Sequence, residues 1–363
     1  MKYIYPLALL LLLASCQEEK KKEKAGRPDR TKTDWSFYRL ESNVRSVSEK
    51  SYEAVGPGQK GSPRQELASA HDTDLTFNDK GLLVLEKKWL NGNMPYEETT
   101  YTGRKDIVSK IQYLNGQPAI KTDYSRDKYG NITAIIRRNG DNTQLDRTAM
   151  LYNGKLLAET KTFSNQDNPN GRTTYVYDKK GNLKGENLYL NSEYIQVKNL
   201  YEYDAQNRKI SETRYSKDKT LYKTVFEYRD GNLVKKETTG PDGVIASTEK
   251  SSYDKKGNLL ERYIYDGFDK SQIHEMRSYD TNGNMTGNKV TRNDKIEFEA
   301  LNKYDERNNL VKTQTANGAG QIYDSRVYSY DYDSKGNWIK KTVYINDKPS
   351  IIIERAISYL EIE

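Results

Sequence analysis

The chain has 363 residues, enough for a sizeable core, yet only 34% of them are hydrophobic and 31% are charged. It contains 30 tyrosines against 6 phenylalanines, which favours strands with a tyrosine-lined face over a thick aliphatic interior and argues against disorder. The net charge of +7 comes from interspersed lysines and acids without a basic stripe, so nucleic acid is not an expected partner.

The first sixteen residues predict the cellular address. Lys2 precedes an apolar run that ends at Leu13, which is too short to span a bilayer and is typical of a signal peptide over residues 1–15. The sequence Leu13-Ala14-Ser15-Cys16 resembles a bacterial lipobox, and this resemblance implies cleavage before Cys16 and lipid attachment to its sulfur. The alternative is a chance cysteine within a signal peptide. Because Cys16 is the only cysteine, no intramolecular disulfide is expected.

Residues 16–33 are polar and charged, and they predict a flexible tether between the lipid and the fold. The segment Gln17-Glu18-Glu19 resembles the acidic surface-export signal of some Gram-negative lipoproteins, although Lys20 to Lys22 dilute the resemblance. We therefore expect an outer-membrane lipoprotein anchored by its acyl chains, facing either the cell surface or the periplasm.

Residues 34–363 are expected to form one β-hairpin repeat domain. The stretch that begins at Asp34 predicts an opening strand, and residues 54–72, rich in Gly, Pro and Ser, predict a mobile loop. Over residues 74–359 an aromatic-led motif returns at intervals of about 25 residues, which is typical of a repeat architecture. Two copies, Tyr177–Leu183 and Tyr253–Leu259, share the identical sequence YDKKGNL.

Each copy reads as a turn. In seven clean copies the residue after the aromatic is an Asp, or Asn78 in the first copy, and it can accept hydrogen bonds from the N–H groups of the turn; the remaining copies vary the loop. Three residues later stands a Gly or an Asn, the two residues that most readily adopt positive φ. The turn-defining pairs are Asp178 with Gly181, Asp204 with Asn207, Asp254 with Gly257, Asp280 with Gly283, Asp305 with Asn308, and Asp333 with Gly336.

A second turn, often Asn-Gly, lies midway through many repeats, so each repeat holds two strands. The sequence thus predicts an all-β fold without helix after the signal peptide: an elongated, curled antiparallel meander of roughly 20 strands. A sheet of this length must twist, curl or close, and we favour a curled sheet. The apolar run Ile351–Ile353 near the C-terminus predicts a closing strand.

The motifs YDKKGNL, YDTNGNM, YDERNNL and YDSKGNW resemble the YD repeats of the RHS family, over about residues 74–359. The resemblance implies β-strand repeats that, in toxin proteins, spiral into a shell around a C-terminal cargo; family members are often described as sugar-binding or cell-surface proteins. The sequence contains no RHS-type autoproteolytic core motif, and we expect no cargo domain. It is more similar to the short, lipid-anchored YD-repeat lipoproteins of Gram-negative envelopes.

No catalytic, cofactor-binding or metal site is expected, and the protein is not expected to be an enzyme. The two histidines, His71 and His274, lack partners for a catalytic triad or a zinc site, and both are expected to be solvated. Turn chemistry already explains the repeated Asp and Gly residues, so a calcium site is not favoured.

Aromatic side chains are the remaining candidates for function, because Tyr and Trp offer flat apolar faces with a polar edge to sugars or proteins. Their alternative role is cross-strand packing. We expect a non-catalytic binding or scaffolding surface for glycan or protein. Two alternatives stay open: a shell or accessory component of a polymorphic-toxin system, and a periplasm-facing envelope-assembly factor. The candidate binding aromatics are Trp89, Tyr113, Tyr189, Tyr265 and Tyr344.

Overall fold

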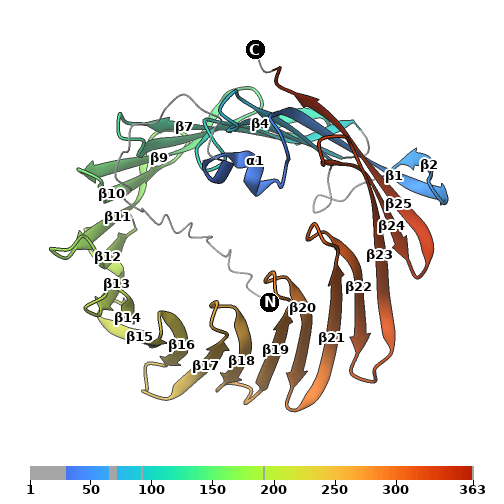
Figure 1. Ribbon diagram of the computed structural model, residues 1–363. Coiled ribbons are helices and arrows are strands. Elements are labelled where there is room, and N and C mark those ends of the chain that lie inside the picture. Colours follow the sequence, from blue (N-terminus) through green and yellow to red (C-terminus); the bar gives the residue numbers. More distant parts are fainter. Residues whose placement is uncertain (1–29, 65–71, 91–92, 191–192, 362–363) are drawn as a thin grey trace.

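The computed structural model describes residues 30–64, 72–90, 93–190 and 193–361, and most of these residues lie in β-strands (Figure 1). The helical segments are a 3-10 turn, η1 (Arg30–Lys32), and one short helix, α1 (Asp34–Phe37). Neither has the length or the apolar character of a helix that crosses a bilayer, and no other helix lies in the described ranges. The strands are β1 (Val44–Gly56), β2 (Gln59–Pro63), β3 (Asp72–Phe77), β4 (Leu83–Leu90), β5 (Met94–Tyr101), β6 (Ile107–Leu114), β7 (Gln117–Arg126), β8 (Ile132–Asn139), β9 (Gln144–Asn153), β10 (Leu156–Phe163), β11 (Pro169–Tyr177), β12 (Leu183–Tyr189), β13 (Ile195–Tyr203), β14 (Lys209–Ser216), β15 (Lys219–Arg229), β16 (Asn232–Thr239), β17 (Ile245–Tyr253), β18 (Leu259–Asp266), β19 (Gln272–Tyr279), β20 (Met285–Arg292), β21 (Lys295–Tyr304), β22 (Leu310–Asn317), β23 (Ile322–Tyr332), β24 (Trp338–Ile345) and β25 (Lys348–Tyr359).

The strands form one antiparallel meander that closes on itself (Figure 1). From β3 to β25 each strand pairs with the next along the chain, and β1 pairs with both β25 and β3. Since β2 pairs with β1 alone, 24 of the 25 strands make up the ring. At a strand spacing of ~4.8 Å, a ring of 24 strands has a circumference of about 115 Å and a diameter of about 37 Å before strand tilt is added.

The all-β antiparallel meander is confirmed, but two finer expectations were wrong: the sheet is closed rather than curled and open, and it has 25 strands rather than roughly 20. The physical reason for closure lies in the first and last strands. At 13 and 12 residues, β1 and β25 are the two longest strands, and they pair from Val44 opposite Tyr359 to Glu53 opposite Ile351. This seam removes the two open edges that an unclosed sheet would expose.

The beginning of the domain also differs from the prediction. Residues from Asp34 form α1 instead of an opening strand, and the first strand begins at Val44. Part of the predicted loop 54–72 is a hairpin, in which β1 and β2 are joined by a turn with Gly58 at φ 70°. The signal peptide, Cys16, the tether as far as residue 29, and residues 65–71 with His71 lie outside the described residues.

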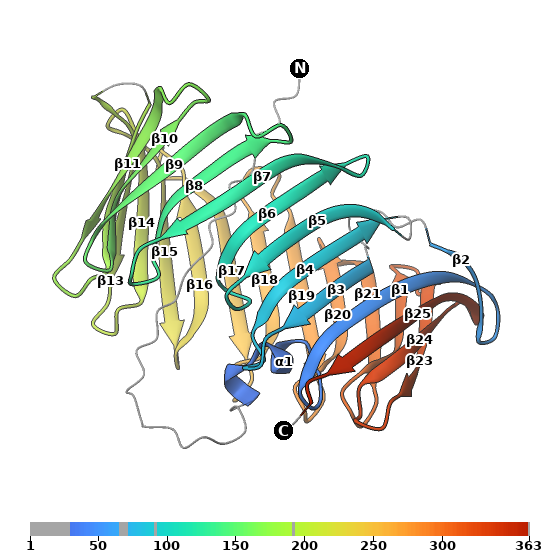
Figure 2. The same cartoon turned by 90° about the horizontal axis from the view of Figure 1, so that it is seen from above.

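The turns of a meander alternate between two ends, so the ring has two rims (Figure 2). We call the turns from β3–β4 to β23–β24 the YD turns and their end the YD rim. The turns from β1–β2 to β24–β25 form the opposite end, the NG rim. Helix α1 lies inside the ring at the YD rim (Figure 1), where the Asp34 N–H donates to the carbonyl of Gly81 at 2.8 Å.

A compact apolar cluster fixes α1 in this place. The Trp35 side chain is 1% exposed, and its indole N–H donates to the carbonyl of Val44 at 2.8 Å. A Cβ at Gly81, where φ is 73°, would lie 2.6 Å from the Trp35 ring, so this position needs glycine for both backbone and space. The cluster consists of Trp35, Leu40, Val44, Val47, Leu75, Phe77 and Leu83.

The strand register assigns each side chain to one wall of the ring. Val47 and Leu75 lie opposite each other and pack with α1, so their side of the sheet is the inner wall. Residues directly across neighbouring strands share a face and successive residues alternate, so the assignment continues through Glu86 and Thr99 around the ring. Followed through β25 and β1, the register returns to Val47 on the same wall.

Candidate binding surface

The YD turns have a common backbone geometry. The seven clean copies place their Gly or Asn at φ values between 61° and 89°, in the left-handed region. The same side-chain hydrogen bonds accompany this conformation. In one copy, Asp178 Oδ1 accepts from the N–H groups of Lys180 and Asn182 at 2.8 and 2.9 Å. Local turn chemistry therefore occupies these carboxylates. The left-handed positions are Gly81, Gly181, Asn207, Gly257, Gly283, Asn308 and Gly336.

A third turn residue was not singled out in the sequence. Asn182 follows Gly181 and donates its side-chain N–H to Asp178 Oδ2 at 2.9 Å. The same bond recurs between Asn258 and Asp254 at 2.8 Å. The recurring Asn after Gly was visible in the sequence, but its partner becomes evident only once the turn is folded.

The tyrosines before the turns tie neighbouring hairpins together. The hydroxyl of Tyr203 donates to the carbonyl of Leu183 at 2.8 Å, and that of Tyr253 donates to the carbonyl of Leu233 at 2.9 Å. Burial raises the pKa of Tyr203, and the charge of Asp178 raises it further, so the hydroxyl keeps its proton. The tyrosines before the turns therefore have a structural role. We expect a binding surface on the outer wall instead.

The inner wall carries charges that are already neutralised. Glu97 accepts from Lys88 at 2.9 Å and from Lys110 at 3.0 Å. Burial acts to raise the pKa of Glu97, but the hydrogen bonds from the two lysines outweigh it and lower the pKa below its ordinary value. Farther round the ring, Glu275 is held between Arg262 and Arg277, each at 2.6 Å. Such groups support the wall and leave few charges available to a ligand.

All five candidate aromatics lie on the outer wall, on five strands distributed around the ring. The structure does not bring them together. The Trp89 indole N–H donates to Asp74 at 2.8 Å, and the Lys50 ammonium lies 5.1 Å from its ring. The guanidinium of Arg172 lies 4.2 Å from the ring of Tyr189. The candidates belong to β4 (Trp89), β6 (Tyr113), β12 (Tyr189), β18 (Tyr265) and β24 (Tyr344).

The cross-strand neighbours separate one candidate from the other four. An apolar residue stands directly opposite four of them: Trp89 faces Pro95, Tyr113 faces Pro118, Tyr189 faces Ile195, and Tyr344 faces Pro349. Cross-strand packing of this kind stabilises a sheet. Tyr265 instead faces Gln272 and lies near a second pair of rings, Tyr263 and His274.

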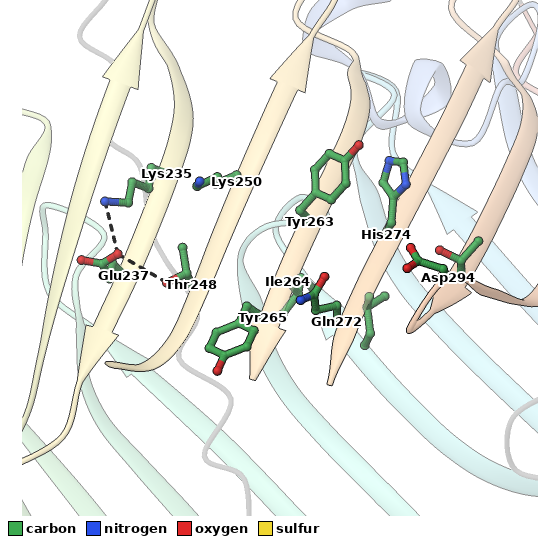
Figure 3. A pocket seen from close by; sticks show the side chains of 12 residues that line it. Lys235, Glu237, Thr248, Lys250, Tyr263, Ile264, Tyr265, Gln272, His274 and Asp294 are labelled. Atoms are coloured by element: carbon green, nitrogen blue, oxygen red, sulfur yellow. Dashed lines mark hydrogen bonds and ion pairs between the residues drawn. The ribbon is translucent and has the colours of Figure 1, made fainter. Parts of the chain in front are cut away.

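Tyr263 and His274 form a stacked pair on the outer wall, on β18 and β19 (Figure 3). Their ring centroids are 3.9 Å apart and their planes are inclined by 11°. Tyr263 is 48% exposed and Tyr265 is 36% exposed, so both offer aromatic surface to solvent. Tyr265 is among the candidates that the sequence predicts, whereas neither member of the stack is, because their contact depends on the β18–β19 register.

A pocket of about 630 Å³ surrounds this stack. Lys250 lies directly opposite Tyr263 on β17. Lys235 lies farther along the wall and forms an ion pair with Glu237 at 3.2 Å (Figure 3). Aromatic faces are thus combined with hydrogen-bonding side chains in one concave surface. We call it the outer pocket; its principal residues are Lys235, Lys250, Tyr263, Tyr265, Gln272 and His274.

His274 is less solvated than expected. Its side chain is 22% exposed, and Nε2 is buried without a hydrogen-bond partner among the described residues. The nearest carboxylate oxygen, on Glu261, is 3.9 Å from Nε2. Stacking under Tyr263 explains the loss of solvent. The described ranges contain no group of three or more His, Cys, Asp or Glu residues that could hold a metal ion.

Neither a protein-family profile nor a curated protein matches the chain. Among solved structures, the chain is similar to TcdB2-TccC3 without its hypervariable C-terminal region, with 10% identity, coverage of 84% of this chain and 19% of that chain, and a TM-score of 0.35. A second TcdB2-TccC3 structure has 12% identity, coverage of 77% and 21%, and a TM-score of 0.27. This chain therefore spans about a fifth of the TcdB2-TccC3 chains.

The chain is also similar to a porin-like protein from Bacteroides uniformis ATCC 8492, with 9% identity, coverage of 88% of this chain and 98% of that chain, and a TM-score of 0.22. Likenesses with TM-scores this low carry no weight for the function of this chain. The YD motifs accordingly remain a resemblance to the RHS family.

Proposed function

We propose that this protein is a lipid-anchored envelope protein that binds a glycan in its outer pocket without catalysing a reaction. The observation that carries the proposal is the Tyr263–His274 stack, whose Tyr263 side chain is exposed, beside the exposed Tyr265. An aromatic face packs against the C–H face of a sugar ring, while side chains such as Lys250 and Gln272 can bond its hydroxyls. A protein ligand is the alternative occupant of the same surface.

A glycan array followed by titration of the retained glycans tests the proposal. Tyr263→Ala should weaken binding about tenfold, the effect of one aromatic contact of about 1.4 kcal/mol. Tyr344→Ala is the matched control, because Tyr344 lies on the outer wall of β24, outside the outer pocket. Silence of the array, or equal losses in the two variants, would remove glycan binding at this site.

The anchoring part of the proposal rests on Cys16. Cys16→Ala should allow a high-salt wash to release the chain from the membrane fraction, because the acyl chains supply the stable attachment and salt screens any charge contact that remains. Protease treatment of intact cells then separates surface display from a periplasmic location, since the folded ring is cleaved from outside only when it is displayed. Protection of the ring would favour the periplasm-facing assembly factor.

A toxin-associated shell is the second candidate. The closed ring supports it, because a closed ring can surround a polypeptide and an open sheet cannot. A shell component encloses a polypeptide. Purification of the native protein with a second polypeptide that resists protease until the ring is unfolded would support this role, and a ring purified without such a polypeptide would count against it.

A further inference from the structure

We infer that the YD rim is the face that this protein turns toward the bilayer, where the lysines of the YD turns contact anionic lipid headgroups. The inference rests on the proposed lipid anchor at Cys16 and adds to it an orientation of the ring and a second membrane contact. It concerns a different surface from the outer pocket.

The chain enters the ring at the YD rim. Besides the Asp34–Gly81 bond, the carboxylate of Asp34 accepts from the N–H groups of Leu83 and Arg104, both at 2.8 Å. At the other side of the seam, the Asn337 side chain accepts from the N–H of Glu41 at 2.6 Å and donates to its carbonyl at 2.9 Å. These bonds fix residues 34–41 to the YD rim, and the chain that leads to Cys16 starts there.

The tether between Cys16 and Arg30 limits how far the ring can lie from the lipid anchor. Fourteen residue steps separate Cys16 from Arg30, and they span at most about 50 Å when fully extended. The wall of the ring is about 30 Å tall, since typical strands of 8 to 10 residues rise ~3.4 Å per residue. The YD rim is therefore the rim closer to the lipid anchor. If the NG rim faced the bilayer, the tether would have to span the height of the wall, which takes up most of its extended length. The charge of the two rims decides between these two orientations.

The two rims differ in charge. The YD turns hold 12 basic and 11 acidic residues, whereas the NG turns, leaving aside the β2–β3 connection with Arg64 and Glu66, hold 2 basic and 8 acidic residues. An anionic surface consequently repels the NG rim far more than the YD rim. The charged residues of the NG turns are Asp141, Asp167, Glu193, Lys217, Asp218, Asp242, Asp269, Lys270, Asp294 and Asp347.

At the YD rim the exposed lysines outnumber the exposed acids, which are Asp79, Asp106, Asp230 and Glu306. The leading aspartates direct their carboxylates into their own turns, as Asp254 does toward the N–H groups of Lys256 and Asn258 at 2.8 and 2.9 Å. Nine turn lysines are exposed and form no ion pair within the described part of the chain, so they can meet phosphates; one of them, Lys256, donates its ammonium to the carbonyl of Thr281 at 2.7 Å. The nine are Lys80, Lys105, Lys128, Lys155, Lys179, Lys180, Lys255, Lys256 and Lys335.

Vesicle co-sedimentation of the mature chain, residues 16–363, with Cys16→Ala tests this contact without the signal peptide and without the acyl anchor. Binding is expected to vesicles of phosphatidylethanolamine with cardiolipin, to fall with added salt, and to be absent from phosphatidylethanolamine alone. Each lysine near an anionic surface strengthens binding about fivefold, so the combined variant K179E, K180E, K255E and K256E should weaken binding at least about a hundredfold.

The matched control carries Lys217→Glu and Lys270→Glu on the NG rim and should bind the anionic vesicles as the parent chain does. Equal binding to neutral vesicles, or an equal loss in the control, would overturn the inference. Unchanged far-UV circular dichroism and unfolding temperature verify that the variants are folded. Glycan binding at the outer pocket and anchoring through Cys16 should both survive the four lysine changes, so a failure of the proposed function is recognised separately.

Discussion

At the scale of the residue, the YD turn depends on one left-handed position. Gly181 has φ 86°, and a Cβ placed there would meet no atom within 4 Å, so only the backbone resists a side chain. Gly181→Ala should lower the free energy of unfolding by about 1–2 kcal/mol. Gly181→Asn should cost less, because Asn207 and Asn308 occupy the same turn position at φ 61° and 62°. Urea unfolding measures the difference, and equal losses would contradict it.

Gly81 occupies the same position of its turn, but the space around it is restricted as well. A Cβ there also collides with the Trp35 ring at 2.6 Å, so the structure must give way in addition to the strained backbone. Gly81→Ala should therefore destabilise the protein more than Gly181→Ala in the same urea measurement. An equal effect would mean that α1 can leave the YD rim at little cost.

The turn carboxylates predict a dependence of stability on pH. The hydrogen bond from the Asn258 side chain lowers the pKa of Asp254, and backbone N–H groups lower it further below the ordinary value of 3.8. A depressed folded pKa contributes stability above pH 3.8 that is lost as the pH falls through the folded value. Thermal unfolding between neutral and acid pH should show this loss.

The first copy supplies the control for that titration. Asn78 occupies the Asp position, and its side-chain oxygen accepts from the N–H groups of Lys80 and Leu82 at 3.0 and 2.9 Å. Replacing Asp178, Asp254 and Asp280 together by Asn should accordingly keep the fold at neutral pH and flatten the acid dependence. An unchanged acid transition would place its origin in other carboxylates.

At the scale of the element, each hairpin is joined to its neighbour by a tyrosine hydroxyl as well as by the strand ladder. Tyr203→Phe removes the bond to the Leu183 carbonyl and leaves that acceptor without its partner, so it should cost about 1 kcal/mol of unfolding free energy. Tyr344→Phe is the matched control, since its hydroxyl has no hydrogen bond among the described residues. Similar losses in chemical denaturation would argue against the hydroxyl tie.

The hairpins were predictable because their signals are local. An Asp, a Gly or Asn three residues on, and a flanking aromatic specify a turn within a few residues of sequence. Helix α1 was not predictable in this way, because Trp35 forms it by packing against strands that follow much later in the chain. The β1–β2 hairpin was missed for a related reason: its Gly and Pro content resembles that of an irregular loop.

The binding surface, too, could be predicted from the sequence only in part. The sequence predicts Tyr265 as a candidate binding aromatic, but the stack of Tyr263 on His274 requires the register of β18 against β19. The registers also give four of the five candidate aromatics apolar partners, which the repeat pattern alone did not distinguish from a binding role. Long-range pairing thus decides which aromatic surface remains available to a ligand.

At the scale of the whole molecule, the closed ring makes a covalent test possible. Ser46 on β1 and Ser358 on β25 face each other across the seam with their hydroxyl oxygens 2.6 Å apart. In a chain that also carries Cys16→Ala, cysteines at these two positions should form a disulfide, because side chains so placed satisfy its distance requirement. Joining positions this far apart in the chain should stabilise the ring by up to about 5 kcal/mol. Cysteines at Ser46 and Ser350 are the control, since Ser350 is not opposite Ser46 in the seam register. Mass spectrometry without reductant should find the bond in the first variant and not in the second, and two free thiols in the first would mean that the strands do not meet.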